Sequence, residues 1–300
     1  MKKISIHIVL FALPVILLVF LVPMDKNRPY AGLGNYCSNR GVWLEHRLYR
    51  NSSPVDLAFM GSSRTINTMN EEVLSRHLPD YDMLNFAYCR YGRNLQYLLI
   101  KDLIEIKKIR YLVLEVRADE NPYSHSAFPY LAKNQDLLRA HLLFNKDWLT
   151  DWTRAFQFRL QLMQESLWKK EIQYPLDSGD YGFYANPTIP DPALLAQSKA
   201  DRIAEDRTVG WKRKMDNVYP LHYLNRIVDY CKAHNVELFF LYLPSYGVPL
   251  EEPSNAEVYR ENGTLLIPPK SIFEEESNWA DPNHINEDGA EMLSNWVGEQ

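Results

Sequence analysis

The chain has 300 residues, of which 46% are hydrophobic and 24% are charged, proportions that are ordinary for a folded globular protein. Its formal net charge of −5 argues against a general nucleic-acid binder, because such proteins need a concentrated basic face. Cys37, Cys89 and Cys231 are too few and too widely spaced for a zinc-ligand array or a dense disulfide framework, although one bridge is possible.

The first predicted element is an apolar segment, Ile4 to Val22, which follows two lysines. It is long enough to span a bilayer as a helix, and no small-x-small cleavage site follows it. We therefore expect residues 1–25 to form an uncleaved membrane anchor. Basic residues flank both ends, so charge alone does not decide the orientation. Residues 26–54, which carry turn-forming Gly, Ser and Pro, are expected to link this anchor to the folded domain.

Apolar runs alternate with helical stretches from residue 55 onward. Hydrophobic residues recur at helical spacing in Arg93 to Lys108 and in Pro220 to His234. Strands that alternate with helices indicate a parallel sheet with helices on both faces. The expected strands are 55–60, 83–87, 110–116 and 236–243, with a short fifth at 264–267.

The regular alternation stops after the third expected strand. Residues 117–215 are rich in aromatic side chains and in amphipathic helical patterns, and they are too long for a plain connection. We expect this segment to be a helical insertion within a single catalytic domain, residues 55–300.

Ser63 stands just after the first expected strand, in Gly61-Ser62-Ser63. The turn after such a strand lies at the carboxyl edge of the sheet, where ligands bind in open α/β proteins. Gly61 permits a tight turn, and the backbone N–H groups after it can face a developing oxyanion. Alone, Gly-Ser-Ser is more often an ordinary turn.

Asp281 and His284 stand near the other end of the chain, in Asp-Pro-Asn-His. A histidine has an ordinary pKa of about 6.5, which suits it to accept a proton from serine, and a carboxylate can fix its tautomer. We expect Asp281 to cap a short helix that begins at Pro282, placing both side chains on one face. Alone, this motif is more often a helix cap. With Ser63 it predicts a Ser-His-Asp triad.

The two motifs resemble the first and last blocks of the SGNH, or GDSL-type, hydrolase superfamily, with Ser62 in place of the more usual Asp. The Gly-Ser-Ser start and the single anchor are most similar to the extracytoplasmic proteins of teichoic-acid D-alanylation and alginate O-acetylation. The resemblance covers about residues 55–116 and 220–297. It implies a three-layer α/β/α, SGNH/flavodoxin-like fold with a parallel sheet of about five strands.

The oxyanion hole departs from the pattern of this superfamily. Its second block usually offers a Gly N–H soon after an Asn, but here Gly92 follows Asn85 late, so either Arg90 or Gly92 is the candidate donor. The third block, Gly-x-Asn-Asp, is missing after the third expected strand. Arg117 or Asn121 is the candidate replacement for its Asn.

Together, the triad and the resemblance predict a membrane-anchored, extracytoplasmic serine esterase or O-acyltransferase that acts on a cell-surface polysaccharide, in the bacterial periplasm or at the cell surface. No metal or organic cofactor is implied. The resemblance also implies a membrane partner that exports the acyl group. The alternative, prompted by the missing third block, is a catalytically degenerate binding or scaffold protein on the same fold. A conventional secreted lipase is a third, weaker option.

Overall fold

The computed structural model of the protein describes residues 13–14, 17–21, 27–33, 37, 40–140, 144–167, 182–204, 211–249 and 251–300. Most of the expected anchor, Ile4 to Val22, lies outside these residues. Among the described residues, no helix combines the length and the apolar character that crossing a membrane requires. The anchor therefore stays a prediction.

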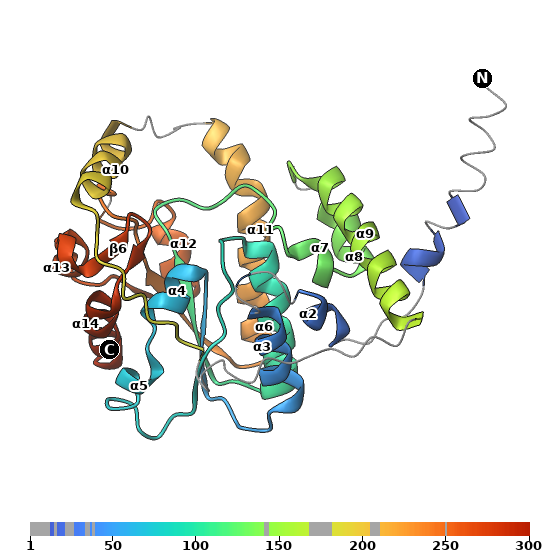
Figure 1. Ribbon diagram of the computed structural model, residues 1–300, viewed down its shortest axis with the longest axis horizontal. Helices are drawn as coiled ribbons and strands as arrows, with labels where there is room; N and C mark the ends of the chain where they lie inside the picture. The colour runs from blue at the N-terminus through green and yellow to red at the C-terminus, as the bar shows by residue number, and fades with distance from the viewer. Residues whose placement is uncertain are drawn as a thin grey trace.

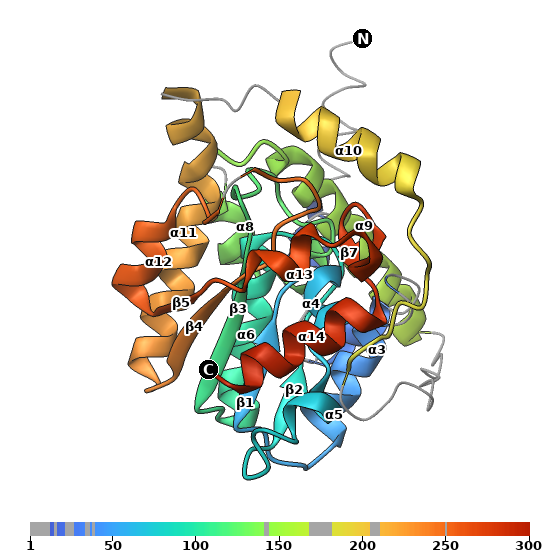
Figure 2. The ribbon, with the colours of Figure 1, turned by 90° about the vertical axis from the view of Figure 1, so that its left-hand side faces the viewer.

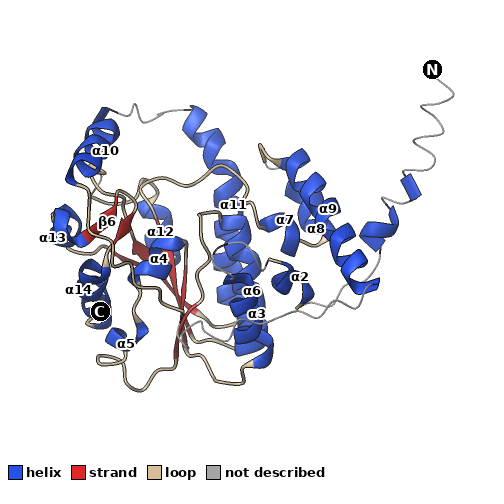
Figure 3. Ribbon diagram, viewed as in Figure 1, coloured by secondary structure: helices blue, strands red, loops and turns tan. Residues whose placement is uncertain are grey.

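A five-stranded parallel sheet forms the centre of the molecule (Figures 1 and 3). Its order is β2-β1-β3-β4-β5. The chain therefore passes from β1 to β2 in one direction and then crosses back to β3 on the other side of β1, which makes the position between β1 and β3 a switch point. Ligands bind at such a switch point in doubly wound folds. The α/β prediction is confirmed, and the five strands match the predicted ones to within a few residues: β1 (Leu57–Met60), β2 (Met83–Asn85), β3 (Tyr111–Val116), β4 (Glu237–Tyr242) and β5 (Thr264–Leu266).

Helices cover both faces of the sheet. Successive strand residues point to opposite sides, so each face presents its own apolar side chains to the helices that cover it. Ala58 and Met60 pack in one hydrophobic cluster, and Leu57 and Phe59 pack in another. The first face is covered by α3 (Arg40–Glu45), α6 (Arg93–Lys107) and α11 (Trp211–Ala233). Figure 2 looks onto the second face, which is covered by α5 (Glu71–Leu74), α13 (Lys270–Glu274) and α14 (Glu287–Gly298).

The two long helices of the first face differ in how well the sequence predicts them. Helix α6 ends one residue before its predicted end, where Lys108 adopts a left-handed conformation (φ 56°). Helix α11 begins nine residues before the predicted start at Pro220, which lies buried inside the helix. A proline removes one helical hydrogen bond, so it was a reasonable but wrong marker of the helix start.

The segment expected to be a link, residues 26–54, contributes to the core instead. It contains α2 (Arg28–Gly32), α3 and a short π-helix η1 (His46–Arg50). Tyr30 and Leu44 are at most 1% exposed, and the Tyr30 hydroxyl donates to Asp102 Oδ2 at 2.7 Å. These residues are therefore part of the folded domain.

The described parts of the predicted insertion, 117–215, are largely helical. Helices α7 (Phe128–Leu131) and α8 (Asn134–Ala140) pack against the long helix α9 (Trp148–Leu167). Helix α10 (Pro192–Ala204) lies apart from them and crosses over the region of α13 and β7 (His284–Ile285) (Figure 2). The other helices with bounds in the described part of the chain are α4 (Ser63–Thr68), α12 (Ala256–Asn262) and the 3₁₀ helix η3 (Glu276–Asn278).

Candidate active site

The turn after β1 presents Ser63 as the first residue of a short helix, α4 (Ser63–Thr68). The Ser62 hydroxyl caps this helix by accepting the Arg64 N–H at 3.1 Å. Within the described part of the chain, the Ser63 N–H has no hydrogen-bond acceptor, as is usual in a first helical turn. It is therefore available to an oxygen atom of a substrate.

Gly61 has a different role from the predicted one. A Cβ atom at this position would collide with Thr65 Oγ1 and with the carboxylate of Glu115. Gly61 is buried and does not line the cleft beside Ser63. The glycine therefore allows the turn to approach Glu115, and it does not contact the space in which a ligand would bind.

Asp281 and His284 lie on a hairpin rather than on the expected short helix. The antiparallel strands β6 (Trp279–Asp281) and β7 form this hairpin. Asp281 Oδ1 accepts the N–H groups of Asn283 at 2.7 Å and His284 at 3.1 Å. An aspartate followed by proline suits an Asx turn as well as a helix cap, and the strand pairing decides between them here.

The three predicted catalytic side chains form one chain of hydrogen bonds. Ser63 Oγ lies 2.8 Å from His284 Nε2, and His284 Nδ1 lies 2.8 Å from Asp281 Oδ2. Partial burial alone would raise the pKa of Asp281, but hydrogen bonds from His284 and from the Asn283 N–H lower it below its usual value. An ionised Asp281 favours a proton on Nδ1, which leaves Nε2 free to accept the proton of Ser63.

A buried carboxylate that the sequence analysis missed holds the turn that carries Ser63, the predicted nucleophile. Glu115 lies in β3 and accepts the Ser62 N–H at 2.6 Å, the Ser62 hydroxyl at 2.8 Å and the Thr65 hydroxyl at 2.7 Å. It also accepts Arg117 Nε at 2.7 Å. Burial would raise the pKa of Glu115, but the charges of Arg117 and Arg64, together with the hydrogen bonds from Ser62 and Arg117, lower the pKa to about 2. The carboxylate is therefore ionised.

Arg64 connects α4, the helix that begins at Ser63, to the hairpin formed by β6 and β7. Its Nη1 donates to the Leu243 carbonyl at 2.7 Å, at the end of β4, and its Nη2 donates to Ser245 Oγ and to Asn283 Oδ1. Arg202 of α10 reaches the same hairpin, at Asn283 Oδ1 (3.1 Å). These contacts fix the position of His284 relative to Ser63.

An open cleft of about 660 Å³ lies beside the triad and has Ser63 and His284 in its wall. Of the predicted oxyanion or substrate-binding residues, Arg90, Arg117 and Asn121 line this cleft, whereas Gly61 and Gly92 do not. The remaining lining residues are Arg64, Cys89, Tyr91, Ser124, His125, Ser126, Asp147, Arg154 and Asn283.

Arg117 and Asn121 differ in how free they are to bind a substrate. The Asn121 amide donates to the Tyr91 carbonyl at 2.7 Å and its oxygen accepts the Tyr123 N–H at 3.2 Å, so this side chain holds its own loop. The Arg117 guanidinium is fixed by Glu115, lies 2.5 Å from Ser62 Oγ and stacks 4.4 Å from the Tyr91 ring. Of these two residues, Arg117 is the one whose side chain contacts the turn that carries Ser63.

The loop that carries Arg90 is held from two sides. Cys89 forms a disulfide with Cys37, and the Cys89 carbonyl lies 2.8 Å from His125 Nε2. Burial lowers the pKa of His125 to about 4, so its neutral ring donates from Nε2 and accepts the Ala127 N–H at Nδ1. Arg90 itself has a left-handed backbone (φ 66°).

Gly92 follows this loop, and its role is steric. A Cβ atom at Gly92 would collide with Cβ of His125. The glycine therefore allows the close approach of His125, which in turn holds the Cys89 carbonyl.

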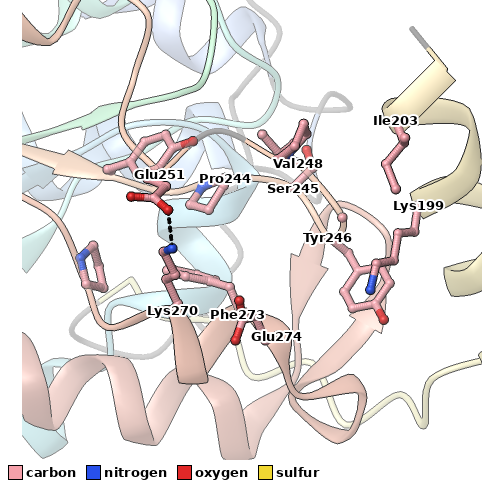
Figure 4. Close-up of a pocket in the computed structure, with 14 residues that line it drawn as sticks. Lys199, Ile203, Pro244, Ser245, Tyr246, Val248, Glu251, Lys270, Phe273 and Glu274 are labelled. Carbon is pink, nitrogen blue, oxygen red and sulfur yellow. Dashed lines mark hydrogen bonds and ion pairs between the residues drawn. The ribbon is translucent and has the colours of Figure 1, made fainter.

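A second pocket, of about 250 Å³, lies under α10 (Figure 4). It is lined by Tyr246, Phe273 and several prolines, with an ion pair between Glu251 and Lys270 at one side. None of the triad residues lines it. In the described part of the chain, no group of three or more His, Cys, Asp or Glu residues is placed so that it could hold a metal ion. The cleft at Ser63 is therefore the candidate active site.

No protein-family model matches this chain, and no curated protein is similar to it in sequence.

Proposed function

We propose that the protein is a serine esterase or O-acyltransferase of the SGNH type that acts on acyl groups of a cell-surface polysaccharide. The observation that carries this proposal is the hydrogen-bonded series Ser63–His284–Asp281 at the carboxyl edge of the sheet, beside an open cleft. The strand order, with Ser63 directly after β1 at the switch point, supports the assignment of fold type.

In the first step, Ser63 Oγ attacks the carbonyl carbon of the ester while its proton moves to His284 Nε2. Asp281 stabilises the resulting imidazolium. The tetrahedral intermediate collapses when the C–O bond to the alcohol breaks, and His284 returns the proton to the leaving alkoxide. The product is an acyl-serine and a free alcohol.

In the second step, the acyl-serine is attacked by an oxygen nucleophile. His284 takes the proton of that nucleophile and then gives it to Ser63 Oγ as the acyl group leaves. Water as the nucleophile gives hydrolysis, and a sugar hydroxyl gives acyl transfer. The triad activates either one, so the acceptor is decided by what the cleft binds.

The oxyanion of both intermediates is stabilised by the Ser63 N–H and the Arg117 guanidinium. The Ser62 N–H does not take part, because it already donates to Glu115. Donors of this kind typically contribute about 100-fold or more to the rate. A cationic donor held by a buried carboxylate would compensate for the missing third sequence block.

The proposed location outside the cytoplasm rests on the predicted anchor and on the resemblance to envelope acylation proteins, which also supplies the proposed acyl-exporting partner. The disulfide between Cys37 and Cys89 supports an oxidising compartment, because such bonds seldom persist in the cytosol.

The alternative is a scaffold on the same fold that has lost catalysis. Labelling of the full-length protein in detergent with a fluorophosphonate, together with the hydrolysis of p-nitrophenyl acetate, separates the two. Ser63→Ala should abolish labelling, and Ser63→Ala and His284→Ala should each reduce hydrolysis by at least about 1,000-fold. Ser75→Ala, which changes an exposed serine outside the cleft, is the matched control and should behave like the wild type. Equal hydrolysis in the Ser63→Ala variant would favour the scaffold.

A further inference from the structure

The charge of the cleft is opposite to that of the chain as a whole. Four arginines line the cleft, Arg64, Arg90, Arg117 and Arg154, against a single carboxylate, Asp147. The whole chain has a net charge of −5. A cleft lined by one sign of charge concentrates ligands of the opposite sign.

Two of these arginines form no ion pair with a carboxylate among the described residues, although the charge of Arg154 acts on Asp151, one turn earlier in α9. Among the described residues, the contact made by Arg90 is a long one to Ser126 Oγ (3.4 Å), and Arg154 of α9 forms no ion pair. The Asp147 carboxylate accepts the Ser124 N–H at 3.0 Å, and among the described residues it forms no ion pair with either arginine. Arg90 and Arg154 therefore come from separate elements, a loop and the helical insertion, to one cleft in which neither makes a direct ion pair.

Arg64, a third arginine of the cleft, is largely buried and adds to its positive potential. Only 8% of Arg64 is exposed, and its Nε is buried without a hydrogen-bond partner. Its acceptors are a carbonyl, a hydroxyl and an amide oxygen, none of which is charged. The charge of Glu115 acts on Arg64, but Glu115 makes its direct ion pair with Arg117. A buried guanidinium without a direct ion pair is costly unless a further anion approaches it.

We propose that the cleft takes an ester whose alcohol or acyl part carries an oxyacid anion, a carboxylate or a phosphate, which Arg90 and Arg154 bind. This inference rests on the proposed function of Ser63. The planar guanidinium presents paired N–H donors that match both kinds of anion. A volume of about 660 Å³ is that of a small-molecule site, so the anion and the ester lie within one sugar-sized group. Arg117 and the Ser63 N–H serve the oxyanion, whereas Arg154 selects the substrate.

Binding tests this without requiring catalysis. The full-length Ser63→Ala variant in detergent is titrated calorimetrically with meta-acetoxybenzoate, meta-acetoxyphenyl phosphate and the neutral meta-acetoxybenzamide. The anionic esters should bind roughly 10-fold tighter or better than the amide at low ionic strength, and the preference should shrink as salt is added. The carboxylate and phosphate probes show which anion is favoured. Equal affinity for all three overturns the proposal.

Arginine variants locate the effect. Adding Arg154→Gln should reduce the preference for the anionic esters, and adding both Arg90→Gln and Arg154→Gln should bring it close to one. Arg76→Gln is the matched control, since Arg76 is exposed outside the cleft with only a 3.8 Å contact to Glu291. A preference that survives in the double variant, with folding checked by circular dichroism, also overturns the proposal.

The same three esters, given to the protein with Ser63 intact, separate this inference from the proposed function. Selective binding of the anionic probes with cleavage of none would leave the anion site standing and refute the esterase. Cleavage through Ser63 with equal kcat/KM for charged and neutral esters would keep the esterase and refute the anion site.

Discussion

Replacing Glu115 with Gln should loosen the turn that carries Ser63 without changing any of the three triad side chains. The carboxylate accepts hydrogen bonds from Ser62, Thr65 and Arg117. A glutamine offers one oxygen and two N–H donors in the same space, so it cannot accept all of these bonds. Arg117, the proposed oxyanion donor, also loses the charge that holds it.

The size of the effect follows from the pKa of Glu115. Its value of about 2 lies roughly 2.5 below the ordinary value of 4.5, which corresponds to about 3 kcal/mol of stability at pH 7. Because the folded pKa is the lower one, this stability is present above about pH 4.5 and is lost as the pH falls through about 2. The Arg117 side chain is 23% exposed, so solvent screens part of its ion pair with Glu115. The figure of about 3 kcal/mol is therefore an upper value.

Thermal unfolding and kinetics measure the two consequences. Glu115→Gln should lower the Tm by roughly 5–10 °C at pH 7, and the difference from the wild type should shrink toward pH 3. The kcat for p-nitrophenyl acetate should fall by about 100-fold with little change in KM, because the nucleophile and the oxyanion donor are displaced.

The matched control is Glu291→Gln, which removes the acidic partner of Arg76 at the surface and should cost less than about 1 kcal/mol. A Glu115→Gln protein with the stability of the wild type at pH 7, or with an unchanged kcat, would refute the proposed role of this carboxylate.

Three further outcomes are expected. Asp281→Asn should lower kcat by about 1,000-fold or more, because an amide can stabilise the wrong tautomer of His284, and a fall of less than 10-fold would contradict this. Burial raises the pKa of Glu71 to about 8, so the stability due to its protonated form is complete below about pH 4.5 and is lost as the pH rises through 8. The Tm of Glu71→Gln relative to wild type should accordingly climb between those values, whereas a constant difference would count against it. Cys37→Ser with Cys89→Ser should cost up to about 4 kcal/mol, because the bond joins residues 52 positions apart, and the variant should no longer respond to a reductant that lowers the wild-type Tm.

The strands, and the meeting of Ser63, His284 and Asp281, were predictable because each depends on a short local pattern. Buried parallel strands are continuous apolar runs, and Ser63 follows the first of them directly. The carboxyl edge of the sheet then limits where a partner for Ser63 can lie. His284 Nε2 lies at that edge, 2.8 Å from the serine oxygen.

The local shape of the Asp281 segment was not predictable by the same means. An aspartate before a proline can begin a helix or close a tight turn, and the choice depends on whether β6 finds a partner in β7. Similarly, the glycine-containing segment before η1 resembles a link in sequence, yet its residues Tyr30 and Leu44 are buried in the core. In both cases the deciding contacts are made with residues distant in sequence.

The residues that shape the site gave weaker signals. Glu115 is an acidic residue within an otherwise apolar strand, and this pattern could have marked it as a buried functional group. Arg64 directly follows the nucleophile, but its contacts are to Leu243, Ser245 and Asn283, about 180 to 220 positions away. The role of such a side chain becomes visible only when the chain is folded.

Arg64 and Glu115 also bear on the choice between an enzyme and a scaffold. Together they tie three segments to the nucleophile helix: the turn after β1, the end of β3 and the hairpin. Burying charged groups is unfavourable unless their bonds are well made, and replacing such groups by apolar ones is often neutral or stabilising. A scaffold that needed only this fold would therefore be expected to lose them. A triad needs its members held to within about 0.5 Å, and the two buried charges meet that need, which is why we favour the active enzyme.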